Sequence, residues 1–78
     1  MRLISQAGDI DIPYENTVLS VAGNLIFAYV PIVGEKGIVI ASYSTKKKAE
    51  KVMEMLHNTY AEFTTASIVF QFLKDDEV

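Results

Sequence analysis

The chain has 78 residues and a mass of 8.7 kDa, and 50% of its residues are hydrophobic while 22% are charged. This balance excludes an intrinsically disordered chain, because disordered chains carry less apolar surface and more charge. No apolar run approaches the ~20 residues of a membrane-spanning helix, so we expect a single domain over residues 1–78 with no membrane contact.

The charge and the cysteine content exclude further classes of protein. The formal net charge is −3 at pH 7, whereas proteins that bind phosphate backbones usually carry a basic surplus. With no cysteine, the chain has no disulfide framework, no zinc finger and no thiol chemistry. The start MRLISQ turns polar after two apolar residues, which does not fit a signal peptide. These features predict a cytoplasmic protein.

The first part of the chain reads as a short hairpin. Arg2–Ser5 and Ile10–Ile12 are β-prone segments on either side of Gly8. A glycine can adopt the positive φ of a tight reversal, so we expect the two segments to pair. Pro13 should end the second strand, because proline has no N–H to donate to a ladder.

Three further strands are predicted before residue 44. Val18–Ala22 and Leu25–Val30 are separated by Gly23-Asn24, which is a two-residue hairpin signal. A turn region over residues 34–37 then leads to a strand at Ile38–Tyr43.

The hydrophobic period changes after this strand. From Ala49 onward, apolar residues recur at helical spacing: Val52, Met53, Leu56, Tyr60 and Phe63. This pattern predicts an amphipathic helix over about residues 45–63, with Ser44 as its N-cap, packed on one face of the sheet.

The last predicted strand is Ser67–Phe72. A helix of ~18 residues carries the chain back by ~27 Å, so we expect strand 67–72 to run parallel to strand 38–43 by a right-handed crossover. The predicted fold class is α+β, a mainly antiparallel β-meander with one helix, and the charged tail at 74–78 should fray.

Four stretches carry a resemblance to a known family: MRLISQ (1–6), IDIPYE (10–15), ASYSTKKKAEKVMEML (41–56) and FQFLKDDEV (70–78). Together they resemble a family of small uncharacterised proteins encoded in bacterial prophages and integrative mobile elements. The chain departs from that family at Lys46-Lys47, where an acidic pair is common, and at Leu73, where a proline is common. The resemblance implies a cytoplasmic accessory protein of phage type and brings no activity, cofactor or catalytic residue.

The candidate catalytic residues are few. Asp9 and Asp11 would share one face of a strand and could meet a cation such as Mg²⁺; alternatively, Asp9 finishes a turn and Asp11 faces water. His57 is the single histidine, and as a general base it would need an orienting carboxylate and a nucleophile nearby. The chain has no nucleophile elbow and no glycine-rich phosphate loop, so we predict no enzyme, no cofactor and no bound metal.

A basic run marks the predicted helix start. Positive charge there opposes the helix dipole, and a bound phosphate or nucleic acid would offset that cost. Lys47 and Lys51 share the outer helix face, where each can pair with a glutamate three residues on. Lys46, Lys47 and Lys51 are therefore candidate contacts for an anion or a partner, with a solvated helix face as the alternative.

The aromatic residues favour packing over base stacking. An RNA-binding sheet interleaves aromatic with basic residues, but the predicted strands 25–30, 38–43 and 67–72 contain no lysine or arginine. Packing in a core or an interface therefore accounts better for their aromatic side chains.

Both faces of these strands are apolar. Leu25, Phe27 and Tyr29 alternate with Ile26, Ala28 and Val30, and in the next strand Val39, Ala41 and Tyr43 alternate with Ile38 and Ile40. One helix covers one face, so the other face predicts a homodimer with sheets packed face to face.

Three functional hypotheses follow. The first is a non-enzymatic, self-associating protein that acts by protein–protein interaction on an unidentified protein partner. The second is a small nucleic-acid-binding regulator that uses Lys46–Lys51. The third is a small metal-dependent enzyme around Asp9 and Asp11.

Overall fold

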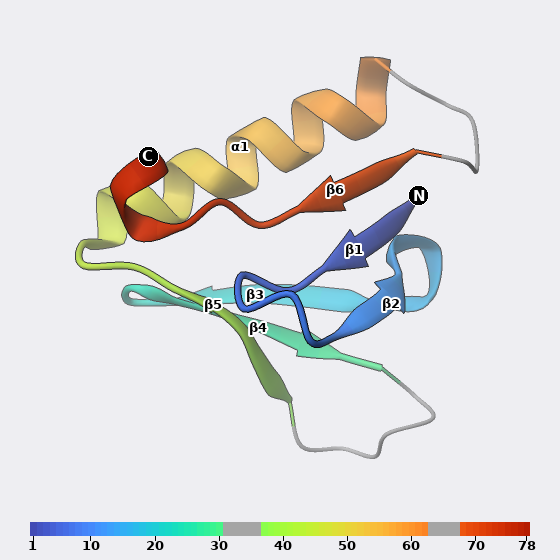
Figure 1. The fold of residues 1–78 in the computed structure, drawn as a ribbon, viewed down its shortest axis with the longest axis horizontal. Helices are drawn as coiled ribbons and strands as arrows, with labels where there is room; N and C mark the ends of the chain where they lie inside the picture. The colour runs from blue at the N-terminus through green and yellow to red at the C-terminus, as the bar shows by residue number, and fades with distance from the viewer. Residues whose placement is uncertain (31–36, 63–67) are drawn as a thin grey trace.

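A computed structural model describes residues 1–30, 37–62 and 68–78 of the protein. One helix and six strands account for most of these residues, and short 3-10 helices follow β2 and end the chain (Figure 1). In chain order the elements are β1 (Arg2–Ile4), β2 (Asp11–Pro13), η1 (Tyr14–Asn16), β3 (Val18–Ala22), β4 (Leu25–Tyr29), β5 (Ile38–Ser42), α1 (Lys46–Glu62), β6 (Val69–Gln71) and η3 (Asp75–Glu77).

The strands form two sheets. Sheet A has the order β2-β1-β6 and sheet B has the order β3-β4-β5. All pairs are antiparallel except β1 with β6, which is parallel. The predicted α+β class, with an antiparallel meander and a parallel final strand, is confirmed.

The predicted partner of the final strand is wrong. We expected strand 67–72 to pair with strand 38–43, but β6 pairs with β1. The segment that follows β1 is already hydrogen-bonded to β5. The N–H of Gln6 donates to the carbonyl of Ile40 (2.9 Å), and the N–H of Ser42 donates to Oε1 of Gln6 (3.0 Å). Gln6 thus links the two sheets, and β6 takes the free side of β1.

Both predicted hairpins are present. Gly8 and Gly23 have φ values of 83° and 62°, as their turns require. Gly23-Asn24 joins β3 to β4 with Ala22 opposite Leu25. The Gly8 turn is organised by the buried hydroxyl of Ser5, which accepts from the N–H groups of Asp9 and Ile10. Most of the predicted turn at 34–37, the helix end at Phe63 and the strand start at Ser67 lie outside the described residues.

Helix α1 agrees with the predicted range to within one residue at its start, and it buries Ala49, Val52 and Leu56. The predicted N-cap is wrong. The hydroxyl of Thr45 accepts from the N–H of Lys48 (3.2 Å), whereas the N–H of Ser44 donates to Asp75 (2.7 Å). Because α1 begins at Lys46, the residue directly before it is Thr45, which takes the capping position.

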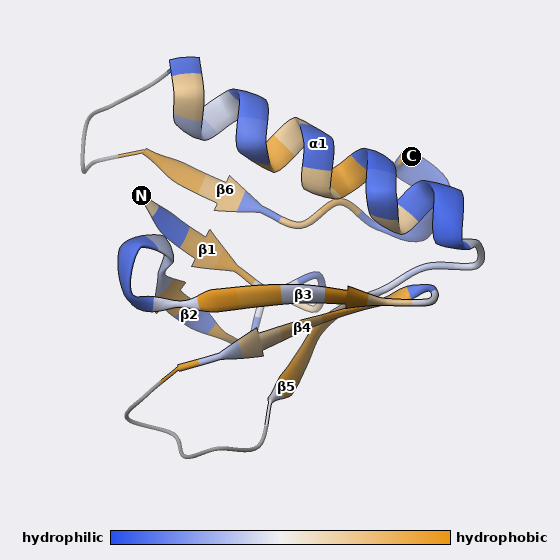
Figure 2. Cartoon of the chain, turned by 180° about the vertical axis from the view of Figure 1, so that it is seen from behind, coloured by the Kyte–Doolittle hydropathy of each residue, from blue (hydrophilic) through white to orange (hydrophobic). Residues whose placement is uncertain are grey.

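The core lies between the inner faces of the two sheets and the apolar side of α1 (Figures 1 and 2). Sheet A contributes Leu3, Ile12 and Phe70 to the core. Helix α1 runs alongside β6 (Figure 1). From sheet B and the segments flanking it come Ile26, Ala28, Val30, Ile40, Ala41 and Tyr43. In the described part of the chain, no helix is long and apolar enough to cross a membrane.

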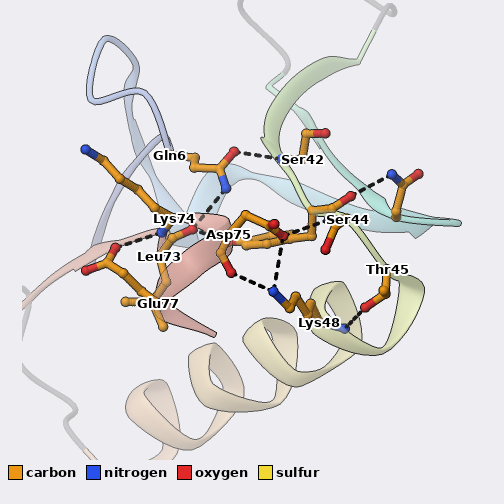
Figure 3. A network of polar contacts seen from close by, with 11 residues as sticks. Gln6, Ser42, Ser44, Thr45, Lys48, Leu73, Lys74, Asp75 and Glu77 are labelled. Atoms are coloured by element: carbon orange, nitrogen blue, oxygen red, sulfur yellow. Dashed lines mark hydrogen bonds and ion pairs between the residues drawn. The ribbon is translucent and has the colours of Figure 1, made fainter.

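The charged tail is held in place, so the expected fraying is wrong. Residues Asp75–Glu77 form η3, and Oε1 of Glu77 accepts from the N–H of Lys74 (2.8 Å). Lys48 donates to the carbonyl of Asp75 (2.8 Å), which joins the tail to α1 (Figure 3). Contacts of Asp75 with Ser44 and Lys48 replace the solvation expected of a charged terminus.

Candidate interaction surface

The outward side of sheet B carries several exposed or half-buried apolar side chains. Opposed residues in the ladder place Val18 beside Tyr29 and Phe27 beside Val39. The exposed fractions of Val18, Val39 and Tyr29 are 66%, 47% and 36%. We call the following side chains the outer face: Val18, Leu25, Phe27, Tyr29 and Val39. Sheet A and α1 lie on the opposite side of sheet B (Figure 2).

A glycine shapes one end of the outer face. A Cβ at Gly37 would lie 2.6 Å from Cε1 of Tyr29, so the ring of Tyr29 rests against the backbone there. Only a residue without a side chain allows this approach. The ring is thereby held along the sheet, where it extends the apolar surface formed by Phe27 and Val39.

The predicted orientation of the side chains in β5 is wrong. We expected Val39, Ala41 and Tyr43 to share a face opposite Ile40, but Ile40, Ala41 and Tyr43 are all buried. The register of β4 with β5 shifts between Ile26 and Phe27, so that an extra residue stands in β5. A bulge of this kind turns the following side chains over, and the outer face therefore ends at Val39.

The outward side of sheet A carries charged side chains as well as apolar ones. Arg2 and Asp11 form an ion pair there, and Gln71 lies in the neighbouring strand. The bond from Arg2 holds the pKa of the Asp11 carboxyl below its ordinary value. The exposed Val69 adjoins Arg2 in the ladder. Charged and apolar groups alternate on this surface, as on a sheet that faces water.

The lysines at the helix start do not form one basic surface. Lys46, Lys47 and Lys51 are exposed on the first turns of α1. Lys47 and Lys51 line a shallow hollow together with Glu50, Glu54, Met55 and Asn58. Lys48 turns away from them and contacts Asp75. The candidate cations thus lie on a surface of mixed charge.

The other candidate residues do not come together. Asp9 accepts from the hydroxyl of Ser5 (2.9 Å), and Asp11 is engaged by Arg2. His57 is exposed on α1 and lines a groove with residues of η1, β3 and α1. Within residues 1–30, 37–62 and 68–78, no group of three or more His, Asp or Glu could hold a metal ion.

A polar cluster that no sequence pattern indicated lies where the two sheets meet the tail. The carbonyl of Leu73 accepts from the hydroxyl of Tyr43 (2.7 Å) and from Nε2 of Gln6 (3.1 Å) (Figure 3). Burial, together with the charges of Asp75 and Glu77, raises the pKa of Tyr43 to about 12. This cluster fastens the end of sheet A to sheet B and has a structural role.

The Asp75 contacts predict a pH dependence of stability. Its bond from the N–H of Ser44 and the nearby Lys48 hold the pKa of its carboxyl below the ordinary 3.8. A lowered folded-state pKa stabilises the protein above the unfolded value, and this contribution is lost as the pH falls through the folded value. Asp75→Asn should therefore lower the melting temperature at pH 7, and the difference from wild type should vanish in strong acid. Asp76→Asn is the control, and equal melting temperatures for Asp75→Asn and wild type at pH 7 would contradict the expectation.

The helix start predicts a second stability effect. Lys46 and Lys47 are the first two residues of α1, where acidic side chains suit the dipole better. Lys46→Glu combined with Lys47→Glu should raise the free energy of unfolding by less than about 1 kcal/mol, measured by urea denaturation. A clear loss of stability would show that these lysines make a specific contact.

Comparisons with known proteins add no relative: no family model, curated protein or solved structure matches this chain.

Proposed function

We propose that this is a non-enzymatic protein that acts by protein–protein interaction and associates with itself through the outer face of sheet B. The observation that carries the proposal is the outer face itself: its five apolar side chains share the outward side of sheet B with Ser20 and Ser42, and β3, β4 and β5 contain no charged residue. Monomers rarely leave more than a few hundred Å² of contiguous apolar surface exposed. Packing against the same face of a second copy gives an isologous two-fold interface of stacked sheets.

The biological setting is part of the proposal. The four stretches at residues 1–6, 10–15, 41–56 and 70–78 resemble proteins of prophages and mobile elements, which supports an accessory protein of that type. The absence of cysteine from the sequence supports a cytoplasmic location. The engagement of Asp9 by Ser5 and of Asp11 by Arg2 supports a role without catalysis.

A charge within the outer face tests the proposed self-association. Val39→Lys should halve the molar mass measured by light scattering during gel filtration, because an unpaired charge in an apolar interface is strongly unfavourable. Val69→Lys is the matched control, since Val69 has a similar exposed fraction (52% against 47%) but lies in sheet A. A wild-type mass of 8.7 kDa at micromolar concentration would overturn the proposal, as would a Val39→Lys mass equal to that of wild type.

The alternative function is a nucleic-acid-binding regulator that uses Lys46, Lys47 and Lys51. The exposure of these side chains at a helix N-terminus favours it. Electrostatic binding is strongest at low salt, so a gel mobility shift of DNA or RNA at about 50 mM salt is the test. An unshifted probe at micromolar protein would eliminate this function.

A further inference from the structure

The edge strands of the two sheets are protected to different degrees. Exposed edges offer unpaired backbone groups to other chains, and proteins blunt them with proline, charge, bulges or short length. In the described part of the chain, β2 contains Pro13 and Asp11, β5 is bulged and bonded by Gln6, and β6 has three residues. By contrast, β3 is a regular five-residue strand of sequence VLSVA, without proline or charge.

The free side of β3 can be defined residue by residue. Ala22 and Leu25 flank the two-residue turn, so they exchange hydrogen bonds, and bonded pairs alternate along the ladder from there. The N–H and C=O groups of Leu19 and Val21 therefore point away from β4. Among the described residues, β3 pairs with β4 alone.

A groove adjoins β3 on the side of the helix. The groove runs between β3 and α1, lined by Leu19 of β3, by Tyr14 of η1, and by Met53 and Tyr60 of α1. The exposed fraction of Tyr60 is 41%.

We propose that β3 is a second self-association surface, at which β3 of another copy pairs antiparallel about a two-fold axis through Ser20. In this register Leu19 faces Val21 of the partner copy, so each copy contributes two residues to four main-chain hydrogen bonds. Val18 then faces Ala22 and Ser20 faces Ser20, so no charge opposes a like charge. The strand is thus complementary to itself in both hydrogen bonding and side-chain size.

The edge uses main-chain groups of Leu19 and Val21, whereas the outer face packs through side chains, so both interfaces can form together. The edge axis stands perpendicular to sheet B, whereas face-to-face packing uses an axis parallel to the sheet. Two such two-fold interfaces combine into a closed tetramer when their axes intersect. Edge pairing does not depend on the proposed face-to-face interface, and it is tested with that interface broken by Val39→Lys.

A single thiol tests the register. Residues facing each other at a non-hydrogen-bonded antiparallel site have Cα atoms about 4.5 Å apart, which is within the range of a disulfide. The chain has no cysteine, so Ser20→Cys in the Val39→Lys background provides one reporter. We expect oxidised dimer to form at least tenfold faster than in the control Ser42→Cys with Val39→Lys, which places the thiol at another exposed serine of sheet B. Equal rates would overturn the edge proposal.

Amide hydrogen exchange measured by NMR supplies a readout that needs no new side chain at the edge. In Val39→Lys, the amides of Leu19 and Val21 should exchange at least tenfold more slowly at high protein concentration than at low concentration. Fast exchange at every concentration would overturn edge pairing, even if the outer face still forms a dimer. Conversely, protection of these amides together with an unchanged mass of Val39→Lys would retain the edge proposal and overturn the proposed face-to-face interface.

Discussion

Phe72→Ala should lower the free energy of unfolding by about 3–5 kcal/mol, the usual cost of removing a buried aromatic side chain. Phe72 is 1% exposed, and its ring meets that of Phe70 edge to face with centroids 5.4 Å apart. Globular domains are stable by roughly 0.05–0.15 kcal/mol per residue, or about 4–12 kcal/mol for this chain. The substitution therefore removes much of the total stability, and urea denaturation followed by circular dichroism measures it.

Val69→Ala is the control for Phe72→Ala. Val69 lies three residues earlier, in β6, and its side chain is 52% exposed. Exposed substitutions of this kind usually change stability by less than about 0.5 kcal/mol. If the two variants were equally stable, the segment that contains Phe72 would not lie in the core as described.

The second large effect is expected in the helix, where Leu56→Ala should cost about 2–5 kcal/mol. Leu56 is 0% exposed and, with Ala49 and Val52, forms the buried stripe of α1. The cavity left behind is expensive because the two sheets and the helix close around it and cannot collapse freely. Thermal unfolding should show a lower melting temperature with a single transition.

Met55→Ala is the matched control in the same helix, since the neighbouring Met55 is 37% exposed. Alanine has a higher helix propensity than methionine, so this variant should be close to wild type in stability. A Leu56→Ala variant as stable as Met55→Ala would contradict the packing of α1 on the sheets.

The sequence predicted the helix and the strands well because their patterns are local. Apolar residues from Ala49 to Tyr60 repeat at helical spacing, and three of those at the centre of the stripe are buried as expected. The hairpin at Gly23-Asn24 was equally predictable, because a two-residue turn fixes the register of β3 with β4. Neither prediction required knowledge of distant residues.

The placement of the final strand could not be predicted in the same way. It depends on Gln6, whose backbone and side chain both form hydrogen bonds with β5. No periodic pattern in the sequence indicates that contact. The contact of Ser44 with Asp75 was equally hidden, because the two residues lie 31 positions apart in the sequence. Contacts between polar groups far apart in the sequence leave no pattern in either segment.

The side chains of the outer face were predictable from the sequence in β4 but not in β5. Alternation correctly assigned Phe27 and Tyr29 to one side of β4 and Ile26 and Ala28 to the other. It failed in β5, where the bulge carries Ala41 and Tyr43 into the core. A bulge changes the side-chain period without any required residue type, so sequence alone could not place the limit of the outer face.

The parallel pairing of β1 with β6 constrains the order of folding. Arg2 faces Val69, so the two partners are 69 − 2 = 67 residues apart in the sequence, whereas each hairpin closes a far shorter loop. Closing a long loop costs entropy before any contact rewards it, and long-range pairing slows folding. The hairpins and α1 should therefore form first, with sheet A incomplete until β6 arrives. During synthesis on a ribosome, one edge of β1 remains unpaired until β6 has emerged.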